Sequence, residues 1–126
     1  MKKGLLLLAT LSGFLAVSLG AFAAHGLKTI APAELVSIFK LGVDYQFYHT
    51  FGLIALAFSA HWIPSKLINW AAYCFIAGII LFSGSLYIYA FTGVKWLGQI
   101  TPLGGLCFLI GWLLFAAAIW HAKSPE

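Results

Sequence analysis

The sequence predicts an all-α membrane protein with four transmembrane helices in an antiparallel bundle and a short interfacial helix between the first two. Composition, the lengths of the apolar segments and the breaks between them support this prediction. Of the 126 residues, 63% are apolar and only 8% are charged, and the mean hydropathy is +1.01. A soluble domain is nearer half apolar and about a quarter charged. So few charges cannot form a water-facing surface, so lipid is the expected solvent and the bilayer the expected partner.

Four apolar segments are long enough, or nearly so, for the roughly 20 residues that cross a hydrocarbon core. The predicted spans are residues 4–24, 47–62, 67–91 and 101–120, within a single domain covering 1–126. Pro64 breaks the chain before Ser65, which can cap the third helix. Gly93 is a plausible stop for that helix, and Thr101 offers a capping hydroxyl before Pro102.

The first segment also resembles a cleavable signal peptide, because Lys2-Lys3 precedes it and Ala21-Phe22-Ala23 has the form of a cleavage site. Signal peptides usually have a shorter apolar core, of about 7–15 residues, so we expect a retained span. Small residues recur at every fourth position of this segment: Ser12, Ala16, Gly20 and Ala24. That spacing favours close helix packing in lipid.

The connection before the second span has the pattern of a helix lying in the membrane interface. Pro32 can open it, and the prediction places it at residues 32–45. Apolar residues or glycine recur at three- and four-residue spacing: Leu35, Phe39, Gly42, Val43 and Phe47. Charged and polar residues fall mostly on the other side: Glu34, Ser37, Lys40 and Asp44. One apolar and one polar side are typical of an interfacial helix.

The net charge of +4 comes from seven lysines that lie singly, apart from one pair. A nucleic-acid surface needs clustered basic residues, so no nucleic-acid partner is expected. With the N-terminus inside, four lysines are cytoplasmic (Lys2, Lys3, Lys66, Lys123) and three are outside (Lys28, Lys40, Lys95). The positive-inside rule then places both termini in the cytoplasm of a multi-pass protein of the plasma membrane.

Motifs of known enzyme chemistry are missing from the sequence: there is no P-loop, no HExxH and no nucleophile elbow. We therefore predict a protein that is not an enzyme. The histidines divide between the two expected faces, His25 and His49 on one, His61 and His121 on the other. A zinc site needs three or four ligands together, so no metal and no cofactor are predicted. A haem held by His25 and His49 is a minor alternative. Cys74 and Cys107 are expected to be reduced packing residues, with a disulfide or a ligand pair as the alternative.

Four motifs in fixed order resemble the family of small bacterial inner-membrane proteins known as domain of unknown function 423, or UPF0382. They are GAFAAHGL at residues 20–27, YQFYH at 45–49, FSGSLY at 82–87 and TPLGG at 101–105. Ala23 stands where the family typically has glycine. The resemblance covers nearly the whole chain and implies a four-helix plasma-membrane protein. It implies no activity, cofactor or catalytic residue.

Alternating helix directions would bring these motifs to one rim of the bundle. The candidate polar site consists of His25, Asp44, His49, Ser83, Tyr87 and Thr101. Because an unpaired polar group in hydrocarbon costs energy, we expect His49 to bond a partner on another segment: His25, Ser83, Tyr87 or Thr101. The alternative for these side chains is a set of interhelical hydrogen bonds with a purely structural role.

Two functions follow as hypotheses. The first is a structural or accessory protein that packs with itself or with a membrane complex, through small residues expected at helix contacts: Ser12, Ala16, Gly20, Ala24, Gly104, Gly105 and Gly111. The second is a transporter or channel component for a small solute or a proton, with a shallow polar site at the rim. Glycines at the start of the fourth span could also leave a helix N-terminus open to an anion, which is a lesser alternative.

Overall fold

The computed structural model describes residues 2–123, and every regular element in this range is helical. The first rod contains α1 (Lys3–Phe22), the π-helical turn η1 (Ala23–Leu27) and α2 (Lys28–Ile30), and the second rod is α3 (Ala33–Trp62). The third contains α4 (Lys66–Gly78), the π-helical turn η2 (Ile79–Ser83) and α5 (Gly84–Thr92). After the 3₁₀ turn η3 (Lys95–Gln99), α6 (Thr101–Trp120) forms the fourth.

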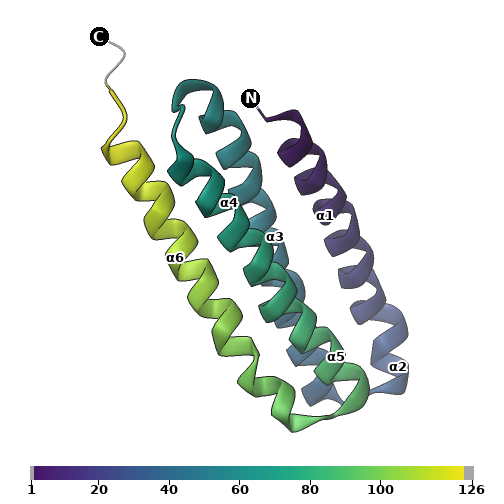
Figure 1. Ribbon diagram of the computed structural model, residues 1–126. Helices are drawn as coiled ribbons and strands as arrows, with labels where there is room; N and C mark the ends of the chain where they lie inside the picture. The colour runs from purple at the N-terminus through teal and green to yellow at the C-terminus, as the bar shows by residue number, and fades with distance from the viewer. Residues whose placement is uncertain (1, 124–126) are drawn as a thin grey trace.

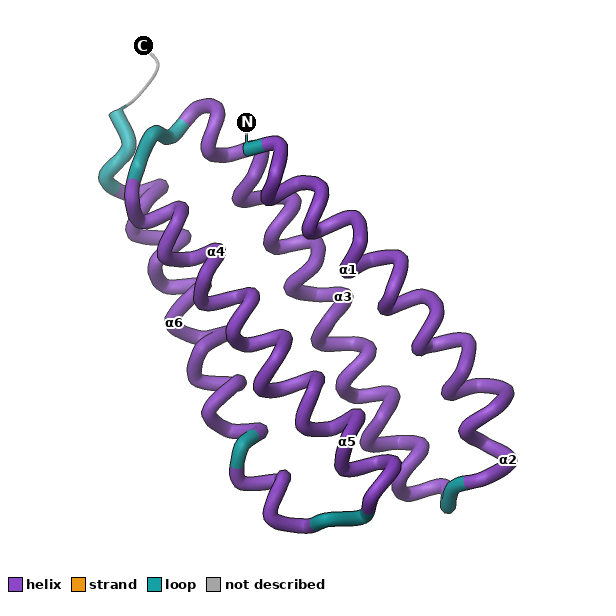
Figure 2. The backbone as a smooth tube through the Cα atoms, turned by 45° about the vertical axis from the view of Figure 1, so that its right-hand side comes forward, coloured by secondary structure: helices purple, strands orange, loops and turns teal. Residues whose placement is uncertain are grey.

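The four rods lie side by side, and consecutive rods run in opposite directions (Figure 1). The start of α1, the α3–α4 loop and the end of α6 lie at one end of the molecule (Figure 2). The turn after α2 and the α5–α6 connection lie at the other end. The α3 rod contacts both α1 and the α4–α5 rod, and α6 packs mainly on α4 and η2.

The predicted fold of four transmembrane helices with a separate interfacial helix at 32–45 was wrong. Residues 33–62 form one uninterrupted helix, so the proposed interfacial helix and second span are parts of α3. Within residues 2–123, three helical stretches are long and apolar enough to cross a membrane: Lys3–Ile30, Lys66–Thr92 and Lys95–Trp120. The more polar sequence of α3, which contains Lys40, Asp44 and Gln46, is not among them.

A regular heptad pattern explains why α3 does not break. Buried residues follow alternating steps of three and four along its whole length: Val36, Phe39, Val43, Gln46, Thr50, Leu53 and Ala57. This is the spacing of one continuous packing seam. Gln46 and Thr50 occupy the middle of the seam. Because both are polar, the apolar pattern in the sequence is interrupted at these residues, although they lie on the same buried face of the helix.

Small residues of α1 and η1 form the opposite side of this seam. Ala9, Ala16 and Ala23 are completely buried at seven-residue spacing. A Cβ atom at Gly20 would lie 3.4 Å from Cγ1 of Val43, in close contact. Of the residues predicted to pack against another helix, Ser12, Ala16 and Gly20 pack against α3 of the same chain. Ala24 is exposed.

Glycines also set the approach of α6 to the α4–α5 rod. A Cβ at Gly104 would collide with the backbone of Phe82 in η2, and one at Gly111 would collide with the Phe75 ring. A Cβ at Gly105, the next residue along from Gly104, would meet only the Phe82 ring, at an ordinary contact distance of 3.9 Å. Two of the three predicted packing glycines therefore lie at tight helix contacts, and Gly105 does not.

The predicted helix ends are partly confirmed. Ser65 accepts a hydrogen bond from the backbone N–H of Leu67, and Gly93 ends α5 in the left-handed conformation, with φ of 69°. Thr101 was expected to cap α6 but is its first helical residue, and its hydroxyl bonds Ser85 instead.

Candidate functional site

Gln46 is at the centre of a hydrogen-bonded network that joins three rods. Its side-chain amide donates to the backbone carbonyl of Ser12 on α1 at 2.9 Å. Its Oε1 accepts a hydrogen bond from the Tyr87 hydroxyl on α5 at 2.6 Å. The Ser12 hydroxyl also lies 2.8 Å from the hydroxyl of Thr50, one helical turn beyond Gln46. This network, here called the Gln46 network, ties α1 and α5 to α3.

His49 bonds a different helix on another side of α3. The indole N–H of Trp112 on α6 donates to Nε2 of His49 at 3.0 Å. Because an indole nitrogen can only donate, Nε2 must be unprotonated, and the proton of the neutral ring is on Nδ1. Nδ1 then donates to the backbone carbonyl of Tyr45 at 2.8 Å. The imidazole also stacks on the ring of Phe108, so its position and tautomer are both fixed.

The expected partner of His49 was found on another helix, but it is none of the four predicted side chains. Ser83 is completely buried and donates to the Gly42 carbonyl at 2.6 Å. Thr101 pairs with the hydroxyl of Ser85 at 2.6 Å. The first bond joins η2 to α3 and the second joins α5 to α6, and neither reaches His49.

The remaining candidates are at the surface. His25 is exposed in η1, and Asp44 is exposed on α3. Of the six predicted site residues, Ser83 and Tyr87 lie side by side next to Gly42. Thr101 bonds Ser85, His49 bonds Trp112, and His25 and Asp44 are at the surface. The six residues do not form one cluster around a shared cavity.

The described residues offer few ligand atoms for a metal ion or for haem iron. Among the described residues, no three His, Cys, Asp or Glu side chains gather in one place. Both nitrogens of His49 are hydrogen-bonded, so neither is free for iron, and His25 is exposed. Cys74 and Cys107, both among the described residues, are free thiols.

Two lateral grooves run between the rods. The first, the α1–α5 groove, has a volume of about 460 Å³, and the Gln46 network lies at its base. Its lining residues are Leu8, Leu11, Ser12, Leu15, Gln46, Ile79, Ile80, Gly84 and Tyr87. The second, the α3–α6 groove, measures about 610 Å³. It is lined by Tyr45, Tyr48, His49, Phe82, Pro102, Gly105, Leu106, Phe108, Leu109 and Trp112.

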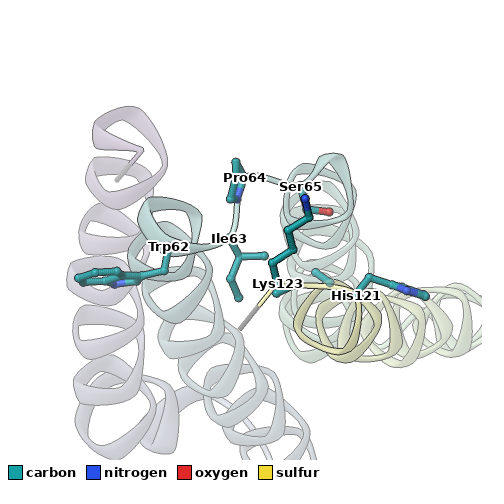
Figure 3. A pocket seen from close by; sticks show the side chains of 8 residues that line it. Trp62, Ile63, Pro64, Ser65, His121 and Lys123 are labelled. Carbon is teal, nitrogen blue, oxygen red and sulfur yellow. The ribbon is translucent and has the colours of Figure 1, made fainter. Parts of the chain in front are cut away.

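A third pocket, of about 450 Å³, lies at the end of the molecule where α3 turns into α4 and α6 ends. In Figure 3 the side chain of Lys123 extends toward Ser65, whereas Trp62 and His121 point away from each other. Trp62 is 78% exposed, and the ring of His61 packs edge-on against it. Aromatic and basic side chains of this kind are typical of the membrane interface.

Sequence reasoning missed Gln46, Thr50, Ser85 and Trp112. The heptad spacing of the buried residues of α3 was the signal for the first two, because it continues through them. Trp112 was assigned no role, since a tryptophan within an apolar segment can equally face lipid. The two π-helical turns were not predicted. The first, η1, lies within the motif at 20–27, and the second, η2, overlaps the start of the motif at 82–87.

Comparison with known proteins gives one family and full-length relatives. The family described as "Protein of unknown function (DUF423)" matches residues 19–105. The UPF0382 membrane protein of Haemophilus influenzae is 44% identical over 124 residues, 98% of this chain and 99% of the relative. UPF0382 membrane protein YwdK of Bacillus subtilis is 42% identical, over 92% and 95% of the two chains. UPF0382 inner membrane protein YgdD of Escherichia coli is 37% identical, over 97% and 93%. No solved structure matches the chain.

Proposed function

Because this chain belongs to the DUF423 (UPF0382) family of membrane proteins, we propose that it is a structural or accessory membrane component that packs with a second membrane helix. The resemblance drawn from the four sequence motifs is thereby confirmed. Its relatives are named membrane proteins, and the Escherichia coli relative is named an inner membrane protein. The partner helix belongs either to a second copy or to a larger complex.

The α1–α5 groove is the observation that carries this proposal. The first rod packs chiefly against α3, and the space between α1 and the α4–α5 rod remains open as a groove with apolar walls. Leu11 and Ile80 on these walls are 58% and 64% exposed. An inserted helix would contact both rods at once.

Gly84 on the wall of this groove supports the same function. A glycine within a helix costs about 0.5–1 kcal/mol relative to alanine. At Gly104 tight packing inside the chain explains this cost, but a Cβ at Gly84 would meet nothing within 4 Å. Small residues at lipid-facing positions allow another helix to approach closely. A partner helix in the groove would therefore explain a glycine that the chain itself does not need.

The decisive experiment replaces Gly84 with leucine. The open space at this position means that the chain should fold normally while its groove is filled. We expect crosslinked species seen with the wild type in native membranes to fall by at least about tenfold, the equivalent of about 1.4 kcal/mol. Ala116→Leu, at an exposed position of α6, is the matched control and should leave them unchanged.

Equal crosslinking of the two variants would refute the proposal. Gly20→Leu is a poor probe, because a side chain there would press on Val43 and disturb the α1–α3 contact itself. The masses of the crosslinked species separate the two kinds of partner, since a second copy of the chain doubles the mass.

Transport of a small solute or a proton, the alternative function drawn from the sequence, has weaker support. Its expected residues were His49, Asp44, Tyr87 and Thr101. Three of them bond to neighbouring helices, through Trp112, Gln46 and Ser85 respectively, and Asp44 is exposed. Flux above that of empty vesicles, measured with the purified protein in liposomes, would reopen this alternative.

A further inference from the structure

We propose that a pocket between the start of α1 and the α3–α4 loop binds the phosphate of one phosphatidylglycerol, an anionic membrane lipid. This pocket, here called the Lys2–Lys66 pocket, has a volume of about 380 Å³, and its lining includes Lys2, Ser65, Lys66 and Asn69. It lies at the end of the molecule that contains the N-terminus (Figure 1). It shares no lining residue with the α1–α5 groove, where we place the partner helix.

Two lysines from separate parts of the chain line this pocket. Lys2 precedes α1, and its backbone N–H donates to the carbonyl of Ala57 on α3 at 3.4 Å, which holds it beside the end of that helix. Lys66 is the first residue of α4. Among the described residues neither lysine has an ion-pair partner, and no Asp or Glu lines the pocket. The described acids, Glu34 and Asp44, both lie in the first half of α3. The positive charge of the pocket is therefore not neutralised by these parts of the chain.

Asn69 adds a hydrogen-bond donor to the pocket rather than an acceptor. Its carbonyl oxygen Oδ1 is buried and has no hydrogen bond within the described residues, so the polar atom that it can present to the pocket is the amide nitrogen. With the amide turned the other way, the oxygen would face the ammonium groups of the lysines. Three donor groups, from Lys2, Lys66 and Asn69, thus share one pocket. An anionic oxygen, such as that of a phosphate, is the acceptor that suits all three.

The neighbouring tryptophans place this pocket at the level of lipid headgroups. Trp62 ends α3 and is 78% exposed, and Trp70 lies one turn beyond Lys66 on α4 and is 58% exposed. Tryptophan is enriched at the interface between membrane and water, where its ring lies among the headgroups. A basic pocket between membrane helices at this depth is within reach of lipid phosphates. We therefore assign the phosphate to a membrane lipid and not to a soluble molecule.

The charge of the pocket selects among phospholipids. Phosphatidylethanolamine and phosphatidylcholine carry a positive amine beside the phosphate, and the two lysines would repel it. The glycerol head of phosphatidylglycerol adds only hydroxyls, so its net negative charge remains. The hydroxyl of Ser65, whose oxygen already accepts from the N–H of Leu67, can donate to such a head.

Native mass spectrometry of the purified full chain in detergent measures this preference directly. The protein is titrated separately with phosphatidylglycerol, phosphatidylethanolamine and phosphatidylcholine that have identical acyl chains. We expect one phosphatidylglycerol per chain, bound at least about tenfold more tightly than either of the other lipids. Glycerol 1-phosphate, the free head without acyl chains, should not displace the bound lipid at equal concentration.

Neighbouring lysines provide a matched pair of variants. Lys2→Gln and Lys66→Gln should each weaken phosphatidylglycerol binding by about fivefold or more. Lys3→Gln removes the same charge at the next position, but Lys3 does not line the pocket, so binding should change by less than about twofold. Asn69→Ala removes the amide donor and should weaken binding by about two- to tenfold. Lys66→Arg keeps the charge and should retain most of the affinity.

Three results would overturn the proposal. Equal losses in Lys2→Gln and Lys3→Gln would show a diffuse attraction between lysines and anionic lipid instead of a site. Equal affinity for the three phospholipids would show that the charge of the head is not read. Displacement of the lipid by glycerol 1-phosphate at equal concentration would identify a soluble ligand. Gly84→Leu should reduce helix association and leave lipid binding unchanged, so this site and the proposed function are tested independently.

Discussion

At the scale of single residues, the polar side chains of this protein act between helices. Gln46 uses both ends of its amide, toward Ser12 on α1 and toward Tyr87 on α5. Within the described residues, one buried side-chain atom, Oδ1 of Asn69, lacks a hydrogen bond. In an apolar solvent such bonds add specificity to helix pairing, because lipid offers no alternative partner. This arrangement favours a packing role for the candidate polar site.

The His49–Trp112 bond gives a prediction at this scale. Trp112→Phe removes the donor and leaves Nε2 of His49 without a partner. We expect the free energy of unfolding in mixed micelles to fall by about 0.6–1.7 kcal/mol, from the average to the largest value measured for hydrogen bonds between membrane helices. Trp120→Phe is the control, since Trp120 is 85% exposed and should contribute little. Equal stability of the two variants would contradict an energetic role for the bond.

At the scale of elements, helix contacts depend on which face each small residue occupies. Ser12, Ala16 and Gly20 were expected to drive association between chains, and they pack on α3 instead. The spacing alone indicates a face capable of close approach. It does not say whether the partner is in the same chain, because both contacts require the same small side chains.

Neighbouring glycines of α6 provide the element-scale prediction. Gly104→Ala should destabilise the α6 contact by about 1–3 kcal/mol, because its methyl group would collide with the backbone of Phe82, which cannot move aside easily. Gly105→Ala should be neutral or stabilising by up to about 1 kcal/mol, since a helix prefers alanine and the methyl group would make only an ordinary contact with Phe82. Thermal unfolding of both variants in the same detergent is the measurement. The reverse order of stability would contradict the observed packing of α6 on η2.

At the scale of the whole molecule, the start of α1 and the end of α6 lie at the same end (Figure 1). Reporters fused at either terminus should therefore be active on the same side of the membrane. The excess of lysine at this end predicts the cytoplasmic side, so a cytoplasm-active reporter should give signal at both termini. The control fuses the same reporters after Gly93, where the opposite result is expected. A periplasmic signal from the C-terminus would overturn the predicted orientation.

The sequence by itself determined the apolar, all-helical character of this protein, its family and the helix ends at Ser65 and Gly93, because composition, motifs and local caps carry that information. Only the tertiary structure showed that residues 33–62 are one helix, since Gln46 and Thr50 interrupt the apolar pattern but remain on the buried face. It also decided that His49 bonds Trp112 and that Gly104 and Gly105 differ. The physical reason is the same in each case. The environment of a side chain depends on the rotation and approach of neighbouring rods, which spacing along one helix does not specify.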